Sequence, residues 1–168
     1  MSFELITGSQ SSKEEQYKSL LSQIASIISD EKNFIANLAN ITSALKYSIE
    51  GFLWVGFYLK EIDKDELVLG PFQGRVACSR ITFGKGVCGA SAVKKETIIV
   101  EDVDKFSGHI VCDALSKSEI VVPVIINNKV VGVLDIDSDK LGNFDKIDKK
   151  YLEELITNTS FLFGHEKK

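Results

Sequence analysis

Three cysteines in the middle of the chain have the clearest capacity for chemistry. Cys78, Cys88 and Cys112 lie 10 and 24 positions apart, beside glycines or an aspartate, and no two form a C-x-x-C pair. A cysteine is often a small buried hydrophobe, but none of these falls on an obvious apolar stripe, and loops carry function more often than core. The group therefore favours redox chemistry.

A zinc site is the alternative use of these thiols. His109 and Cys112 form an H-x-x-C motif, and Cys78 and Cys88 would complete a Cys₃His set. The closely spaced ligand pairs of structural zinc sites are missing, so the spacing favours a protein without a metal or another cofactor.

Acidic residues form a second group. Asp135 and Asp137 alternate with Leu134 and Ile136, so in a strand both acids point to one face. Glu119 precedes an apolar run that suits a neighbouring strand. Crowded carboxylates repel, so at least one should hold its proton to a higher pH than normal. The acids either grip a ligand ammonium and hold a proton, or they form a solvated, edge-protecting strand face.

Two further features suit contact with a small ligand. Trp54 and Tyr58 are four residues apart and share one face of a strand. A lone tryptophan is more often core than ligand wall, but aromatic rings pack well against a thioether-sized ligand. The turn Gly84-Lys85-Gly86 precedes a short helix, whose first N–H groups can bind an anion.

The elements that position these residues follow from periodicity. Apolar residues recur with helical spacing over 11–29, 33–46 and about 144–163, and Ser12 with Glu15 predicts a capping box on the first helix. Strands are expected at 51–60, 66–70, 76–83, 97–103, 119–126 and 129–138, with a hairpin turn at 127–128 and a short helix at 86–96. Residues 104–118 are expected to form a loop.

This order predicts an α+β domain, with a central antiparallel sheet flanked by N- and C-terminal helices. The length of 168 residues, with 44% hydrophobic and 26% charged residues, suits a single domain over residues 1–168. A net charge of −4, with both signs interspersed, argues against nucleic acid or an anionic membrane as a partner. Three is an odd number of cysteines, so one stays unpaired, and free thiols without a visible secretory signal point to the cytoplasm.

Four segments resemble the free methionine-(R)-sulfoxide reductases, a single-domain branch of the GAF fold. These segments are GPFQGRVACSRITFGKGVCGASA, FSGHIVCD, SEIVVPV and GVLDIDS. WVGFY and the two leading helices also fit, so the resemblance covers essentially the whole chain. Ser107 and Asp139 stand where proline is expected in the family pattern, and neither removes a chemical role.

The resemblance implies a thiol-dependent oxidoreductase that reduces free L-methionine (R)-sulfoxide to methionine. It implies that Cys112 attacks the sulfoxide and becomes a sulfenic acid, with Cys78 and Cys88 as disulfide partners. Cys88 remains an alternative attacking thiol. Thioredoxin is the expected reductant of the disulfide, and pairing through the terminal helices makes a homodimer the expected assembly.

The resemblance also implies which residues hold the substrate. The acids are Glu119, Asp135 and Asp137 (Glu119 and Asp137 with catalytic roles as well), and the aromatic wall is Trp54 and Tyr58. A free amino acid also brings a carboxylate, to which the backbone N–H groups of Gly86, Val87 and Cys88 would donate hydrogen bonds. Gly84 and Gly89 are also expected to approach the substrate closely. The alternative functions are a GAF-type module that binds a small ligand and a redox sensor without a substrate.

Overall fold

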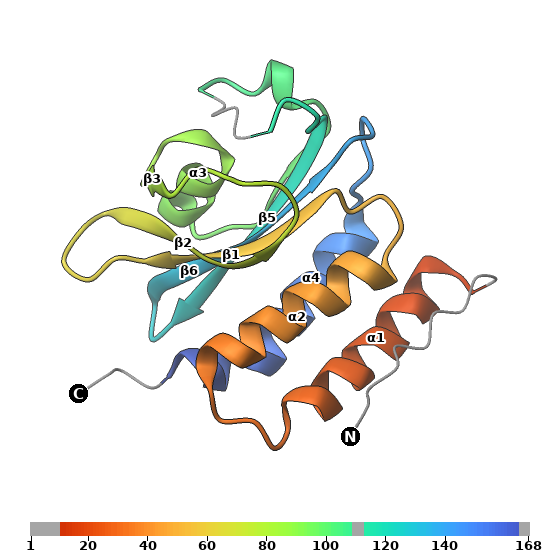
Figure 1. Cartoon of the computed structure of the whole chain (residues 1–168). Coiled ribbons are helices and arrows are strands. Elements are labelled where there is room, and N and C mark those ends of the chain that lie inside the picture. Colours follow the sequence, from red (N-terminus) through yellow and green to blue (C-terminus); the bar gives the residue numbers. More distant parts are fainter. Residues whose placement is uncertain (1–10, 109–112, 165–168) are drawn as a thin grey trace.

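A curled six-stranded antiparallel sheet forms the centre of the computed structural model, which describes residues 11–108 and 113–164 (Figure 1). The strand order is β3-β2-β1-β6-β5-β4. The strands are β1 (Trp54–Lys60), β2 (Glu66–Gln73), β3 (Arg80–Thr82), β4 (Ile98–Val100), β5 (Ser118–Ile126) and β6 (Lys129–Ser138). The predicted α+β class with an antiparallel sheet is confirmed.

The helices divide unequally between the two faces of the sheet. In Figure 1, α1 (Lys13–Ile28), α2 (Phe34–Ser48) and α4 (Lys146–Thr159) lie together on one face, whereas α3 (Gly86–Lys94) lies on the other. The predicted capping box is present, because Ser12 Oγ accepts from the Glu15 N–H at 3.3 Å and the Glu15 carboxylate accepts from the Ser12 N–H at 2.9 Å. Among the described residues, no helix has the length and apolar character needed to cross a membrane.

Alternation along the strands creates two hydrophobic cores. Val55 and Phe57 of β1 pack with residues of α1, α2 and α4, whereas Trp54 and Tyr58 of the same strand pack on the α3 side. The β5–β6 hairpin alternates in the same way and turns at Asn127 and Asn128, whose φ angles of 49° and 62° match the predicted tight turn. The α3 face, with the smaller core, is therefore the face on which polar groups can gather.

Three expected strands are shorter than the sequence pattern indicates. The strand predicted over 51–60 begins only at Trp54. The strand predicted over 76–83 is β3 alone, because residues 74–79 leave the sheet to form a loop. The strand predicted over 97–103 ends at Val100, where Asp102 accepts from the Asp104 N–H and caps a 3-10 turn, η1 (Val103–Lys105). At the C-terminus the last helical turn is also a 3-10 turn, η2 (Ser160–Phe163).

A buried polar contact joins α1 to α4. Asp148 is fully buried, accepts a hydrogen bond of 2.7 Å from the Tyr17 hydroxyl, and forms an ion pair with Lys13. The Tyr17 ring also stacks on Tyr151 with the ring centroids 5.3 Å apart. Because Asp148 also belongs to the capping box of α4, this contact ties the start of α4 to α1.

We expect Tyr17→Phe to lower the free energy of unfolding by about 1–3 kcal/mol, since the phenyl ring keeps the packing but leaves a buried oxygen of Asp148 without its donor. Urea unfolding followed by circular dichroism measures this difference. Tyr47→Phe is the matched control, because Tyr47 is 70% exposed and should change stability by less than about 0.5 kcal/mol. Equal effects of the two substitutions would contradict the assignment.

Candidate active site

A cavity lies on the α3 face of the sheet, beneath the loops 74–79 and 113–117. The space open to the centres of water-sized molecules measures about 40 Å³, and all the space between the lining atoms, open solvent included, about 530 Å³. The cavity brings together these residues expected at the site: Trp54, Tyr58, Gly86, Val87, Cys88, Glu119, Asp135 and Asp137. Residues from β1, β5, β6 and α3 therefore meet at one position, as the sequence predicts.

The register of the sheet sets the three acids side by side. Glu119 of β5 pairs directly with Asp137 of β6, and Asp135 lies two residues before Asp137 on the same strand. Both aspartates line the cavity, while the intervening Ile136 packs in the core on the opposite face. The expectation that the aspartates share one strand face is confirmed.

Burial controls the protonation of these acids. Glu119 and Asp135 are each 6% exposed, and burial raises the pKa of both carboxyl groups well above the ordinary range. Repulsion from Asp135 adds to the effect at Glu119, and repulsion from Asp137 adds to it at Asp135. Asp137 is half-buried, and burial raises its pKa to about 6, against an opposing hydrogen bond from Ser116. The cluster therefore holds protons that ordinary carboxyl groups have lost at neutral pH.

Cys88 is a free thiol on α3 and is almost fully buried. It packs in the core on the α3 side, so the expectation that no cysteine lies on an apolar surface is wrong for this one. The apolar side of α3 faces the sheet, and Cys88 lies on that side. Burial first, and the neighbouring Asp135 second, raise the pKa of the thiol, which also hydrogen-bonds to that acid. In this structure the Cys88 thiol is thus held in its neutral form.

Cys78 lies in the loop 74–79 and is disulfide-bonded. Its thiol is therefore not a ligand in this structure, which argues against the Cys₃His zinc alternative. Cys112 and His109, which sequence reasoning also singled out, lie outside the described residues.

The aromatic wall is a stack of rings that packs against two glycines. The Trp54 ring stacks on Tyr58 at 6.0 Å and on Phe72 at 5.4 Å between centroids. A Cβ atom at Gly56 would lie 2.2 Å from Trp54 Cη2, and one at Gly74 would lie 2.4 Å from Trp54 Cδ1. The indole can occupy this position only because both neighbours are glycines.

The same aromatic residues fix the loops above the cavity. The Trp54 indole N–H donates to the Arg75 carbonyl, and the Tyr58 hydroxyl donates to the Cys78 carbonyl, both at 3.0 Å. Arg75 forms an ion pair with Asp113 at 3.7 Å, which connects the two loops. The wall therefore positions the loop that carries Cys78.

Ser116 is a site residue that sequence reasoning missed. Its hydroxyl donates to Asp137 Oδ1 at 2.5 Å, and both residues line the cavity. The spacing of Asp113 and Ser116 is the sequence signal that could have found it, because an aspartate often begins a turn. In this turn the Asp113 side chain accepts from the Leu115 N–H, and the Asp113 carbonyl accepts from the Ser116 N–H. This turn presents the hydroxyl to the acids.

Two glycines that were expected to approach the substrate, Gly84 and Gly89, do not line the cavity. A Cβ atom at Gly89 would lie 2.5 Å from the Thr82 carbonyl oxygen, so Gly89 permits the close approach of α3 to β3 rather than the approach of a ligand. Gly86 lines the cavity, but its N–H already donates to the Gly108 carbonyl at 3.2 Å.

Comparisons with known proteins agree with this geometry. The family model of the GAF domain matches residues 38–163. The chain is 55% identical to GAF domain-containing protein A of Dictyostelium discoideum, over 88% of this chain and 92% of that protein. It is 44% identical to the free methionine-R-sulfoxide reductase of Saccharomyces cerevisiae, over 93% of this chain and 91% of that protein. An X-ray structure of the free methionine-R-sulfoxide reductase from Neisseria meningitidis in complex with its substrate superposes with a TM-score of 0.90, at 46% identity, and covers 95% of this chain and 96% of that one.

We expect Asp137→Asn to stabilise the fold at high pH but not at low pH. The folded chain binds the Asp137 proton with a pKa of about 6 against an ordinary 3.8, so this contribution to stability is full at low pH and is lost as the pH rises through 6. Asparagine cannot ionise and keeps the acceptor for Ser116. The free energy of unfolding should therefore rise by up to about 3 kcal/mol near pH 8, and change little near pH 4.

Urea unfolding at a series of pH values measures the effect. Asp139→Asn is the matched control, because Asp139 is exposed and should give no pH-dependent gain. A gain for Asp137→Asn of the same size at both ends of the pH range would show that the buried charge is not its cause.

Proposed function

The chain belongs to the free methionine-R-sulfoxide reductases of the GAF domain family, and we propose that it reduces the R-sulfoxide of free methionine to methionine. The observation that carries this proposal is the cavity, in which three carboxyl groups with raised proton affinity meet a thiol and an aromatic wall. Reduction of a sulfoxide needs these groups, because a thiol attacks the sulfur and an acid protonates the departing oxygen. We further propose that residues 1–168 act as one catalytic domain.

The cavity suits a free amino acid at both of its charged ends. Asp137, which ionises near pH 6, pairs with the substrate ammonium at neutral pH, and the Asp135 carboxyl group accepts a hydrogen bond from the same ammonium. The N–H groups of Val87 and Cys88 in the first turn of α3 donate hydrogen bonds to the substrate carboxylate. The Gly86 N–H contributes only if it leaves the Gly108 carbonyl.

The side chain of the substrate then lies along the aromatic wall. Trp54 and Tyr58 line the cavity on the β1 side, and sulfur packs favourably against aromatic rings. A peptide-bound methionine sulfoxide lacks the free ammonium and carboxylate, so it should bind poorly.

Cys112 attacks the sulfoxide sulfur in the proposed reaction. Glu119, whose pKa burial and the neighbouring acids raise, donates a proton to the oxygen. The oxygen passes to the Cys112 sulfur, which yields methionine and a sulfenic acid. Cys88 is a poor attacking group by comparison, since burial beside Asp135 raises the pKa of its thiol and disfavours the thiolate.

The thiol of Cys78 then condenses with the Cys112 sulfenic acid, forming a disulfide and releasing water. The disulfide-bonded state of Cys78 supports this assignment, because Cys88 is a free thiol in the same structure. A dithiol such as thioredoxin reduces this disulfide by thiol–disulfide exchange and is itself oxidised to a disulfide. Val76, two residues before Cys78 in the same loop, is 88% exposed, so this loop is open to such a donor. We also propose a homodimer that pairs through the terminal helices and a cytoplasmic location, where thioredoxin keeps thiols reduced.

We expect the purified chain to form methionine from free L-methionine (R)-sulfoxide when thioredoxin, its reductase and NADPH are supplied. The S epimer and an acetylated, amidated methionine sulfoxide should each react at least about a hundredfold more slowly. The S epimer would direct its oxygen away from the proton donor, and the blocked compound lacks the charged ends that the site binds. Chromatography of the product measures the rates. Disulfide formation with peroxide but no methionine from any sulfoxide would instead indicate a redox sensor.

We expect Cys112→Ser to reduce methionine formation by on the order of a thousandfold or more, since the attacking group is lost. The sharpest assay is a single turnover of the reduced protein without thioredoxin. Cys78→Ser is the matched control: it should still form one equivalent of methionine, but it should not recycle at the normal rate. One equivalent of methionine from Cys112→Ser would rule out Cys112 as the nucleophile.

A further inference from the structure

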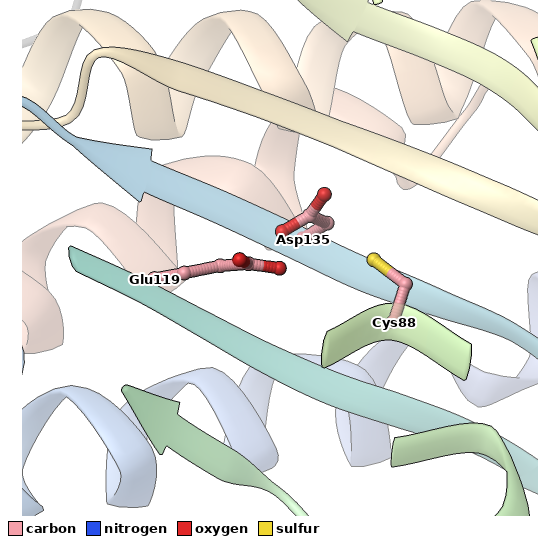
Figure 2. A group of neighbouring side chains, drawn as sticks. All are labelled: Cys88, Glu119 and Asp135. Atoms are coloured by element: carbon pink, nitrogen blue, oxygen red, sulfur yellow. The ribbon is translucent and has the colours of Figure 1, made fainter. Parts of the chain in front are cut away.

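Cys88, Glu119 and Asp135 turn their side chains toward one another from α3, β5 and β6 (Figure 2). The Cys88 sulfur and one carboxylate oxygen from each acid all lie within 4.8 Å of one another, and all three residues are buried. A thiol and carboxyl groups bind divalent metal ions once they lose their protons. We call these three residues the thiol–carboxylate triad.

One oxygen of the triad lacks a hydrogen-bond partner. Asp135 is 6% exposed, and its buried Oδ1 atom finds no donor among residues 11–108 and 113–164. Figure 2 shows the Asp135 carboxyl group directed into the space that it shares with Glu119 and Cys88. A buried acceptor without a donor is costly, and a coordinated cation removes that cost. This oxygen therefore points to a positively charged ligand.

The charge of the cavity also favours a cation. In the described part of the chain, the cavity is lined by the triad and two further aspartates but by no lysine, arginine or histidine. A divalent ion would neutralise these acidic groups.

We propose that the triad binds a divalent metal ion of the zinc class through the Cys88 sulfur and one carboxylate oxygen each of Glu119 and Asp135. Binding releases to solvent the thiol proton and every proton that the carboxyl groups of Glu119 and Asp135 hold. Zinc accepts mixed sulfur and oxygen ligands in a tetrahedron, whose ligand atoms lie about 3.4 to 3.6 Å apart. The triad reaches this geometry if its widest separation closes by about 1 Å. The cavity space of about 40 Å³ holds a water molecule as the fourth ligand.

The bound metal ion inhibits sulfoxide reduction, and this consequence rests on the proposed function. Glu119 and Asp135 cannot bind the metal and also serve the sulfoxide, so the two ligands exclude one another. The site differs from the Cys₃His alternative because it needs neither Cys78 nor Cys112. It is therefore available whether or not Cys78 is disulfide-bonded.

Cobalt tests the site without any substrate. In the double variant Cys78→Ser/Cys112→Ser, Cys88 is the remaining thiol of the chain. We expect Co²⁺ to produce a near-ultraviolet thiolate-to-cobalt charge-transfer band, which Zn²⁺ and free methionine (R)-sulfoxide each remove. Adding Cys88→Ser should abolish the band, and adding Asp135→Asn should weaken cobalt binding by about tenfold or more. Asp139→Asn, at an exposed position on the same segment, is the control that should leave binding unchanged.

A band that survives Cys88→Ser, or the lack of any Cys88-dependent band at about 1 mM Co²⁺, would overturn the metal site. A band that saturating sulfoxide does not displace would overturn the competition with substrate. Circular dichroism of each variant verifies that the fold is retained, and Cys88→Ala serves if Cys88→Ser does not fold. Because the cobalt band needs no turnover, failure of the proposed function would leave this result unchanged.

Discussion

The carboxyl groups of Glu119, Asp135 and Asp137 share one patch of the sheet, and repulsion between buried like charges is the interaction on which the site depends. Burial and repulsion both favour the protonated forms, so the patch retains protons at a pH where exposed acids are ionised. The cavity is lined by no cationic side chain in the described part of the chain. This lining is the basis of our proposal that the acids bind the positive end of a substrate and also supply a proton.

The rest of the fold stabilises this unfavourable arrangement from the opposite face of the sheet. Each acid of β6 is followed or preceded by an apolar residue, such as Leu134 or Ile136, that packs against α1, α2 and α4. Every strand residue that places a carboxyl group in the cavity is thus covalently joined to neighbours in the larger core. The stability lost by burying charge on one face is offset by apolar burial on the other, which explains why β6 lies between β1 and β5 and not at an edge.

Features that depend on local pattern could be predicted from the sequence. Helical periodicity gave α1 and α2, strand alternation put both aspartates on one face, and the Asn127–Asn128 turn defined the hairpin. Features that depend on tertiary contacts could not. The loop 74–79 leaves the sheet where side chains of β1 hydrogen-bond to its carbonyls, and Ser116 reaches Asp137 across 21 positions of the chain. The burial of Cys88 follows from how α3 packs on the sheet.

Burial also separates the roles of the thiols. Cys88 is fixed in a helix and held neutral by its acidic surroundings, whereas Cys78 lies in a half-buried loop segment and is disulfide-bonded. Thiol exchange requires a thiolate and an open approach to the sulfur, and Cys88 has neither in this structure. A neutral thiol can instead hydrogen-bond to a neighbouring carboxyl group, as Cys88 does to Asp135. In the reaction and the metal site that we propose, the substrate ammonium and the catalytic proton occupy different acids of the cavity at the same time, whereas a metal ion on Glu119 and Asp135 would exclude both.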